Sequence, residues 1–365
     1  MWKDPAKVER LDIRGRRMLA VSDIHANLPY FKALLEKLHF CENDELFIVG
    51  DFLEKGEDSL GTLRYVMQLC EAGNVHVVCG NCDFWSDLIN APYHYRNDQL
   101  MYYVMHRTGG ICRDMLLDTG IEPREDLDFI SHIPQLYERY KPEWDFLRSL
   151  PQIIETPHYI FVHGGIDPHL PLEAHTAGQC MKNDAFMNQG HRFSKWVIVG
   201  HWPVMLYLED RVCANPIIDK YSRIISLDGG CVLKDDGQLN GLIIPFEGSE
   251  DFSFEAYDPF PTATVKDYQP ESSRSYYIRW GDNKVQVLER GEEFSRCRHV
   301  RTGYEMDILT KYLYSDSEES ECNDSTDYRP ELFPGDTVSI TERTSRGFLI
   351  KHNGTSGWYF GDLEE

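Results

Sequence analysis

The sequence lacks any long apolar run. No stretch of its 365 residues approaches the ~20 consecutive apolar residues that a membrane-spanning helix needs. Residues 1–17 are charged and contain no apolar segment of the kind that a secretory signal carries. These two absences predict a chain that acts outside membranes, and the expected location is the cytoplasm.

Positive charge is also scarce. The chain has 37 Lys and Arg residues against 60 Asp and Glu residues, which gives a formal net charge of −23. Proteins that grip nucleic acid or an anionic membrane surface do so with clustered Lys and Arg side chains. We therefore expect neither nucleic acid nor membrane as a partner. An anionic substrate would need a local source of positive charge, such as bound metal ions.

Cysteine pairs are nearly absent. Ten cysteines are scattered along the chain, and Cys79 and Cys82 alone stand at CxxC spacing. We give that spacing no weight because Asn81, between them, has another use below. Without a secretory signal, scattered cysteines predict reduced thiols in the core. The chain has apolar residues for such a core, since 42% are hydrophobic and 12% aromatic. Its length suggests two or three domains.

The first two thirds of the chain alternate between strand and helix patterns. Apolar runs at residues 18–22, 45–49 and 75–79 are separated by segments with helical spacing at 28–38 and 59–71. This order is typical of an α/β sheet. Residues 93–150 are expected to be helical and to cover one side of the sheet. Further strands are expected at 159–162, 196–199, 224–227 and 242–244.

Near residue 247 the sequence pattern changes to short segments in which polar and apolar residues alternate. We predict a catalytic domain at residues 1–250 and two small all-β units at 275–314 and 330–365, which share a Gly-Asp start and resemble SH3-type barrels. Residues 315–329 between them are acidic and polar, so we expect a flexible linker there. The aromatic residues at 358–360 would either line a groove for a protein partner or fill the core of the second unit.

Polar residues follow five of the apolar runs directly. They converge if the runs are strands of open α/β sheets, because ligands bind beyond the carboxyl ends of such strands. Their carboxylates, imidazoles and one amide suit divalent metals. One shared carboxylate can hold two ions ~3.5–4 Å apart. The candidate ligands are Asp23, His25, Asp51, Asn81, His163 and His201.

The motifs that carry these residues are D-x-H at 23–25, G-D at 50–51, G-N at 80–81, H-G-G at 163–165 and G-H at 200–201. In this order they resemble the calcineurin-like metallophosphoesterase superfamily over residues 18–246. Within it the chain is similar to phosphoprotein phosphatases and bacterial diadenosine tetraphosphatases. The resemblance implies a four-layer α/β/β/α sandwich, here followed by the small SH3-like units.

The resemblance also implies a role for each candidate. Asp23 and His25 would hold one metal ion, and Asp51 would bridge it to a second ion held by Asn81, His163 and His201. Manganese is the expected metal, with iron, zinc or nickel as alternatives, and a bridging hydroxide would be the nucleophile. Lys55 would bind the phosphate, with Asn81 and Lys182 as further substrate-binding residues. Asp51, Lys55 and Asp83 form the expected catalytic set, with Asp83 either supporting a ligand histidine or capping a helix.

Four positions depart from the family pattern. Lys55 stands where the family has an arginine, and lysine lacks the bidentate fork of the guanidinium group. Glu54 replaces an aspartate that normally orients a histidine, and that histidine is Cys82 here. A thiol is a poor proton donor for a leaving alkoxide, so Cys82 favours substrates with good leaving groups. Lys182 stands near the place of a second arginine.

Three hypotheses remain open. The first is a metal-dependent phosphatase that hydrolyses phosphomonoesters, including phosphoserine or phosphothreonine in proteins. The second is a hydrolase of dinucleoside polyphosphates, or a phosphodiesterase. The third is a catalytically weak, metal-binding scaffold that acts through a protein partner bound to the SH3-like units.

Overall fold

The computed structural model describes residues 2–13, 15–85, 95–106 and 109–365. The chain forms two compact units, each built from several stretches of sequence. The first unit comprises Met1–Pro203, Pro216–Leu233 and Gln238–Asp258. The second comprises Val204–Asn215, Lys234–Gly237 and Pro259–Glu365. No helix in the described ranges is long and apolar enough to cross a bilayer.

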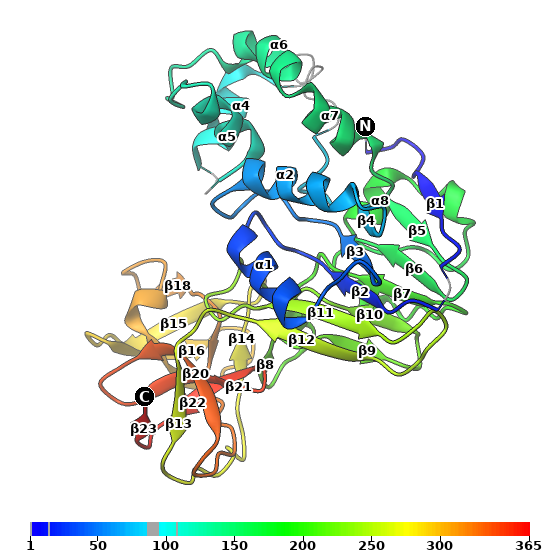
Figure 1. The fold of residues 1–365 in the computed structure, drawn as a ribbon. Coiled ribbons are helices and arrows are strands. Elements are labelled where there is room, and N and C mark those ends of the chain that lie inside the picture. Colours follow the sequence, from blue (N-terminus) through cyan, green and yellow to red (C-terminus); the bar gives the residue numbers. More distant parts are fainter. Residues whose placement is uncertain (1, 14, 86–94, 107–108) are drawn as a thin grey trace. The chain divides into compact units, whose positions relative to one another are not determined.

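The first unit contains two sheets (Figure 1). One has the strand order β12-β11-β2-β3-β4, in which β2, β3 and β4 are parallel and β11 runs antiparallel to β2. The other has the order β1-β5-β6-β7-β10-β9, with β6, β7 and β10 parallel. The strands of the first sheet are β2 (Met18–Val21), β3 (Glu45–Val49), β4 (Val75–Val78), β11 (Leu239–Ile244) and β12 (Ser253–Tyr257). Those of the second are β1 (Val8–Arg10), β5 (Ile153–Glu155), β6 (Tyr159–Val162), β7 (Trp196–Val199), β9 (Ile217–Asp219) and β10 (Ile224–Ser226).

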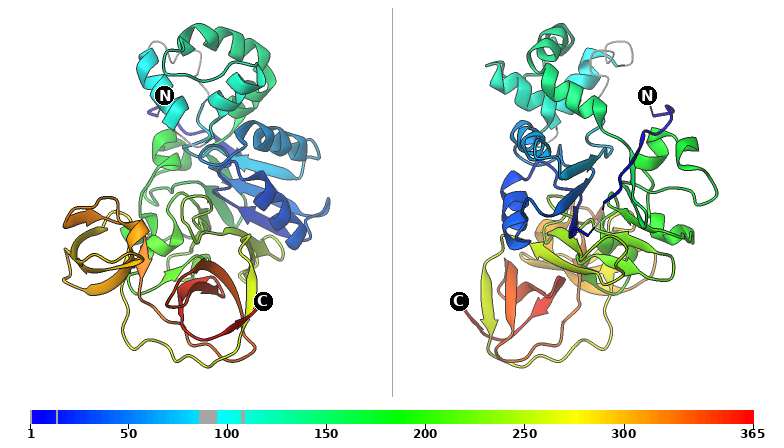
Figure 2. Two further views of the ribbon diagram at one scale, coloured as in Figure 1. Left: turned by 90° about the vertical axis from the view of Figure 1, so that its left-hand side faces the viewer. Right: turned by 45° about the vertical axis from the view of Figure 1, so that its right-hand side comes forward.

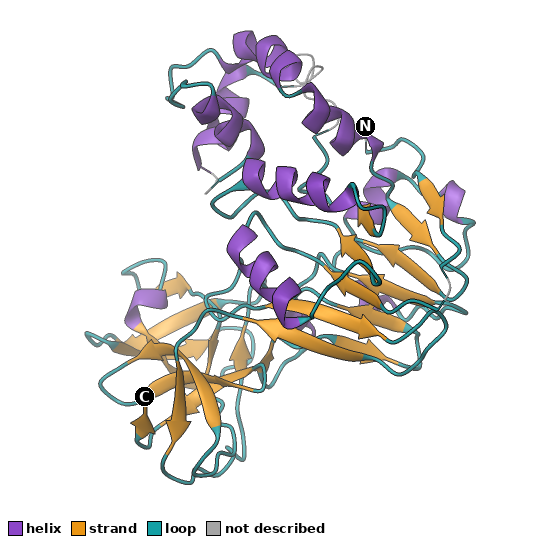
Figure 3. Ribbon diagram, viewed as in Figure 1, coloured by secondary structure: helices purple, strands orange, loops and turns teal. Residues whose placement is uncertain are grey.

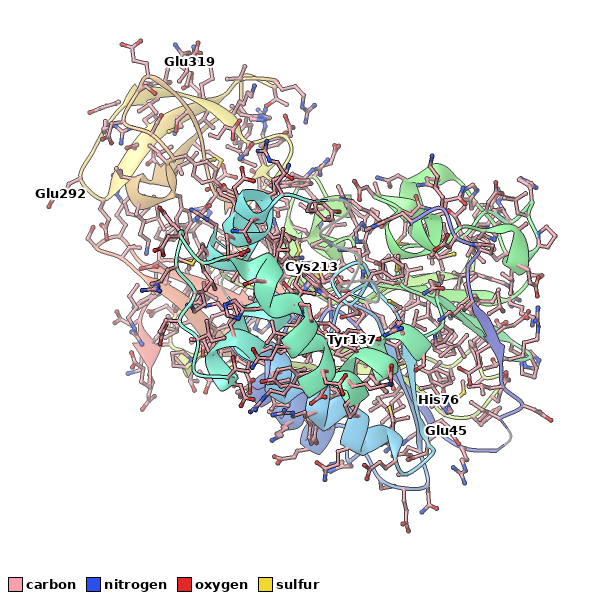
Figure 4. All side chains as sticks on the ribbon, turned by 90° about the horizontal axis from the view of Figure 1, so that it is seen from above. Glu45, His76, Tyr137, Cys213, Glu292 and Glu319 are labelled. Carbon is pink, nitrogen blue, oxygen red and sulfur yellow. The ribbon has the colours of Figure 1, made fainter. Side chains whose placement is uncertain are left out.

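Side chains that alternate along the strands join these sheets into layers. On β2, Met18 and Ala20 belong to the core between the sheets, whereas Leu19 and Val21 face the helices. In the inner core, Phe47 of β3 stacks on Phe161 of β6 with ring centroids 3.8 Å apart. At the start of β3 and β4, His76 Nε2 lies 2.8 Å from Glu45 Oε2 (Figure 4).

Helices cover the outer faces of both sheets. On the five-stranded sheet lie α1 (Leu28–Lys37) and α2 (Ser59–Cys70), drawn in purple in Figure 3. The helices α4 (Asn97–His106), α5 (Ile111–Asp118), α6 (Phe129–Arg139) and α7 (Lys141–Ser149) extend this layer. The outer layer on the six-stranded sheet is thin and includes α8 (Ala177–Met181), η2 (Leu172–Ala174) and η3 (Phe186–Gln189). The predicted α/β/β/α order is confirmed.

The second unit is built almost entirely of β-strands (Figure 2). It has a four-stranded sheet in the order β17-β16-β15-β18, a six-stranded sheet in the order β23-β13-β20-β21-β22-β8, and the pair β14-β19. Its strands are β8 (Val212–Cys213), β13 (Thr262–Val265), β14 (Tyr277–Ile278), β15 (Lys284–Glu289), β16 (Phe294–His299), β17 (Glu305–Leu309), β18 (Glu319–Glu321), β19 (Ser325–Thr326), β20 (Thr337–Arg343), β21 (Phe348–His352), β22 (Thr355–Tyr359) and β23 (Leu363–Glu364), with short helices η4 (Val204–Tyr207) and η5 (Thr310–Tyr312).

The acidic segment at 315–329 is not the flexible linker that we predicted. Its residues 319–321 form β18, which pairs antiparallel with β15, and 325–326 form β19, which pairs with β14. Ser320 and Ser325 are buried there while the acidic neighbours of Ser320 point outward, so alternation lets a polar segment complete a sheet. In the second small unit, Tyr359 is core and Phe360 is exposed, while Trp358 is buried and donates Nε1–H to Thr326 O at 2.8 Å. The SH3-like resemblance and a protein partner remain predictions.

Candidate metal centre

The predicted ligands stand where parallel strands of the first unit end. Asp23, Asp51 and Asn81 follow β2, β3 and β4 of one sheet, and His163 and His201 follow β6 and β7 of the other. Glycines let these ends meet. A Cβ at Gly50, where φ is +81°, would lie 2.6 Å from His163 Nδ1, and a Cβ at Gly200 would collide with Asp23. The edges of both sheets therefore form one site.

Side-chain atoms that could bind a metal fall into two overlapping groups, one of which includes the thiol of Cys82. Atoms of His25, Asp51 and Cys82 lie within 4.8 Å of one another, and so do atoms of Asp51, His163 and His201. Asp51 belongs to both groups, and its Oδ1 is 3.2 Å from His163 Nε2. This is the arrangement that a carboxylate shared between two cations requires.

Asp23 and Asn81 complete the two groups. Asp23 Oδ1 lies 3.7 Å from His25 Nε2, and Asp23 Oδ2 accepts the backbone N–H of His201 at 3.0 Å. The terminal amide of Asn81 lies 2.8 Å from His201 Nδ1. With its oxygen at that position, the amide and the imidazole turn lone pairs toward each other, as two ligands of one cation do. The structure thus brings all six predicted ligands together.

Outer contacts select which nitrogen each histidine presents. His163 Nδ1 lies 2.9 Å from Val49 O, and His25 Nδ1 lies 3.4 Å from Leu53 O, so Nε2 of each ring faces the site. His201 is the reverse, because its Nε2 lies 2.8 Å from Asp184 Oδ1. Such outer partners orient metal-binding histidines and fix their tautomers.

The buried charges of this site fit a cation. Among the described residues, the buried Asp23 Oδ1 has no hydrogen-bond partner, and the buried His163 Nε2, although 3.2 Å from Asp51 Oδ1, makes no hydrogen bond of good geometry. Burial and the neighbouring Asp228 raise the pKa of Asp23 well above its ordinary value. Although burial opposes it, the charges of Asp51 and Asp23 raise the pKa of His163 to about 10. Buried carboxylates with few neighbouring cations, such as Asp23 and Asp51 here, are stabilised by metal ions.

The other two imidazoles are held neutral, which is the form that binds metals. Burial, with the charge of Lys55 second, lowers the pKa of His25 to about 3. Burial, with the charge of His163 second, lowers the pKa of His201 to about 4. The donor set of carboxylates, imidazoles and an amide therefore fits two divalent ions of the manganese, iron or zinc type.

Lys55 and Lys182, the predicted substrate-binding lysines, differ in position. Lys55 Nζ lies 3.4 Å from His25 Nε2, and Lys55 has a positive φ of 73°. Burial opposes its charge, but Cys82 and Asp51 raise the pKa of Lys55, which keeps it cationic. Lys182 is exposed, and its backbone nitrogen would lie 2.9 Å from a Cβ at Gly164. Only Lys55 is shown in contact with a ligand residue.

Asp83, which we expected among the catalytic residues, is bonded to the backbone. Its carboxylate accepts N–H groups from Asp51 at 2.7 Å, Gly80 at 2.9 Å and Leu53 at 3.0 Å. It therefore ties the loop after β3 to the loop after β4. These contacts are neither the histidine partner nor the helix cap that we expected, and they hold the backbone of Asp51 rather than its carboxylate.

Two acidic residues near the site escaped the sequence analysis. Asp228 follows β10, the parallel neighbour of β7, and is fully buried. Its Oδ1 accepts Gly230 N–H at 2.8 Å, while its Oδ2 has no partner in the described chain. The signal was present, since Asp228 follows an apolar run and precedes two glycines, as the predicted ligand His163 does. Asp184, on a loop without such a pattern, gave no signal.

Comparisons with known proteins identify the family of the chain. The family model for calcineurin-like phosphoesterases matches residues 16–221, more than half of the chain. A symmetrical bis(5'-nucleosyl)-tetraphosphatase of Glaesserella parasuis is 27% identical over 180 residues, which cover 48% of this chain and 54% of that protein. The corresponding protein of Vibrio parahaemolyticus is 26% identical over 207 residues, 56% of this chain and 64% of that protein. The chain thus spans about half the length of the curated relatives it matches.

Among solved structures, a serine/threonine phosphatase from Saccharomyces cerevisiae covers 71% of this chain and 85% of its own, with 11% identity and a TM-score of 0.44. A metallophosphoesterase from Sphaerobacter thermophilus covers 67% of this chain and 89% of its own, with 17% identity and a TM-score of 0.38. The matched range, residues 16–221, contains all six candidate ligands from Asp23 to His201. This chain belongs to the calcineurin-like phosphoesterase family.

Proposed function

We propose that this chain is a dimetal phosphohydrolase whose substrates have good leaving groups, with dinucleoside polyphosphates as the leading class. The observation that carries the proposal is the pair of ligand groups that share Asp51. Asp23 and His25 would hold one ion, and Asn81, His163 and His201 the other. Two divalent ions so held activate water near neutral pH and neutralise charge on phosphoryl oxygens.

The protein supplies orientation and a local cation for this chemistry. Contacts to Val49, Leu53 and Asp184 fix the three imidazole rings before substrate arrives. Fixed ligands cost little reorganisation during the reaction. Lys55, adjacent to His25, provides positive charge for the phosphoryl group in a chain whose net charge is −23.

Cys82 is the reason to favour a good leaving group. It is 4% exposed, and burial together with the charge of Asp51 raises the pKa of its thiol well above the ordinary value. An effective proton donor has a pKa near the working pH, so this thiol is poorly suited to protonate an alkoxide. A phosphoanhydride releases a nucleotide that leaves without such help. The names of the relatives from Glaesserella and Vibrio support the same class.

Turnover of three substrates by the full chain tests the proposal. Loaded with manganese, iron, zinc or nickel in turn, it should cleave diadenosine tetraphosphate faster than a phosphoserine peptide or a phosphodiester with a good leaving group. Asp51→Asn should abolish turnover. Cys82→His should speed peptide hydrolysis more than cleavage of the tetraphosphate, because it restores an imidazole where an alkoxide must leave. A wild-type preference for the peptide would instead support a phosphoprotein phosphatase, and no turnover would support a scaffold.

A further inference from the structure

The loop that carries Lys55 has an unusual backbone. Glu54 and Lys55 both have positive φ angles, 67° and 73°. Residues with a Cβ rarely adopt this strained region, so surrounding contacts must hold it in place. The start of the loop is tied to the first metal-binding segment, since Ala26 N–H donates to Phe52 O at 2.8 Å. The backbone of Glu54 is held locally, since its N–H donates to Ser59 Oγ at 3.0 Å, whereas its side chain is held by a different part of the chain.

The carboxylate of Glu54 is bound to helices α4 and α5. Glu54 is fully buried, its Oε2 accepts the hydroxyl of Tyr103 on α4 at 2.9 Å, and its Oε1 accepts the N–H of Ile111 on α5 at 2.9 Å. Ile111 is the first residue of α5, where N–H groups lack partners within the helix. In the family pattern the acid at this position orients a histidine. Here Cys82 stands in the place of that histidine, and the carboxylate of Glu54 accepts hydrogen bonds from the two helices.

A second contact runs in the opposite direction. Asp114 of α5 accepts the N–H of Leu60, in the first turn of α2, at 3.1 Å. Each carboxylate thus accepts a backbone N–H from the first turn of the other helix. Glu54, before α2, accepts from α5, and Asp114 of α5 accepts from α2. Between them the backbones touch. A Cβ at Gly109 would collide with Gly56 O, and a Cβ at Gly56 would collide with His25 O. The backbone is therefore in continuous close contact from the start of α5, through the loop that carries Lys55, to His25.

We propose that Tyr103 and the first turn of α5 position Lys55 through Glu54, so that helices α4 and α5 set how tightly the chain binds a phosphoryl group. Tyr103 is a positioning residue, because it would act on the phosphate through its hydrogen bond to Glu54. The inference rests on the proposed function in one respect, which is that Lys55 meets the phosphate. It assigns helices α4 and α5 a part in substrate affinity that their sequence does not predict.

Binding of inorganic phosphate to the manganese-loaded full chain, measured by calorimetry, tests this assignment without any turnover. Tyr103→Phe removes the hydroxyl that holds Glu54 and keeps the ring. We expect phosphate to bind roughly 3- to 10-fold more weakly, the effect of losing one hydrogen bond. The matched control is Tyr102→Phe, its neighbour on α4, whose side chain is 67% exposed. This control should bind phosphate as the wild type does.

A Lys55→Met background separates positioning from general damage. If Tyr103 acts through Lys55, adding Tyr103→Phe to Lys55→Met should change phosphate affinity little, because the residue being positioned is gone. A merely structural role for Tyr103 would weaken binding equally in both backgrounds. That result overturns the inference, and so does a Tyr103→Phe chain that binds phosphate like the wild type.

The outcomes also separate this inference from the proposed function. A wild-type chain that binds phosphate but cleaves no phosphoester contradicts the proposed function and leaves the Tyr103 comparison intact. A chain that turns over normally while Tyr103→Phe matches Tyr102→Phe contradicts only the positioning role. If the wild type binds no phosphate, the role of Lys55 is wrong and the inference falls with it.

Discussion

Substituting Gly50 by alanine should weaken metal binding, whereas its matched control, Gly73→Ala, should not. Both glycines have nearly the same positive φ, 81° at Gly50 and 77° at Gly73. Alanine at either position should therefore cost a similar roughly 1–2 kcal/mol of backbone strain. They differ in their surroundings, because a Cβ at Gly73 meets nothing within 4 Å.

At Gly50 the added Cβ would stand 2.6 Å from His163 Nδ1 and 2.8 Å from Gly80 Cα. It would be about 0.8 Å inside ordinary contact, which adds an overpacking cost of about 1–3 kcal/mol. The imidazole must withdraw, and its 2.9 Å contact with Val49 O is then lost or lengthened. Loss of such an outer partner typically weakens metal binding about 10- to 100-fold.

The assay has two parts. Urea unfolding of the metal-free variants should place Gly50→Ala about 1–3 kcal/mol below Gly73→Ala. Competition with a chelator should show weakened metal binding in Gly50→Ala alone. The reasoning is refuted if Gly50→Ala binds both ions as tightly as Gly73→Ala does, since the His163 ring would then not depend on the space that Gly50 leaves.

Two further predictions concern buried acids and metal. Asp228→Asn should weaken binding of one metal equivalent by about 10- to 100-fold in a calorimetric titration, as loss of an outer carboxylate does, with Asp219→Asn on β9 as the control; equal affinities would contradict a role for Asp228. Burial raises the pKa of Asp228 to about 6 and that of Asp83 to about 7. At these two acids, and at Asp23, whose pKa is also raised, the metal-free folded chain holds protons that the unfolded chain has released. His25 and His201, whose pKa values are lowered, act in the opposite direction up to about pH 6.5. The three acids outnumber the two histidines, so the free energy of unfolding should fall as pH rises from about 4 to about 7. Urea midpoints at pH 5 and 7.5 check this, and metal at 100 times its Kd should restore about 2.7 kcal/mol; a midpoint that rises with pH in the metal-free chain would be the opposite sign.

The sheet that carries the first ligands could be predicted from local patterns. β2, β3 and β4 are short apolar runs between amphipathic helices, and each ends in a polar residue beside a turn. Such elements depend on neighbours in the sequence, so the hydrophobic periodicity and the turn residues between runs are enough to predict them. The six candidate ligands follow from the ends of these strands and of β6 and β7, and the structure brings them together.

The rest depends on partners that are distant in sequence. The role of Asp83 follows from three backbone N–H groups, two of which lie about 30 residues before it. Asp184 meets His201 through a loop with no pattern of its own. The 315–329 segment was expected to be a flexible linker because its own residues are too polar to form a core. It is ordered instead by pairing with β15 and β14, which are distant in sequence.

The pairing of β8 with β22 bears on how the chain is made. Cys213 pairs with Thr355, so 142 residues separate the two halves of this ladder. At a synthesis rate of about 5–20 residues per second, β8 leaves the ribosome roughly 7–28 s before its partner exists. During that interval β8 lacks its partner strand, and unpaired strand edges invite association with other chains. Removing residues 259–365 would make this condition permanent, so the second unit cannot be deleted as a simple C-terminal appendage.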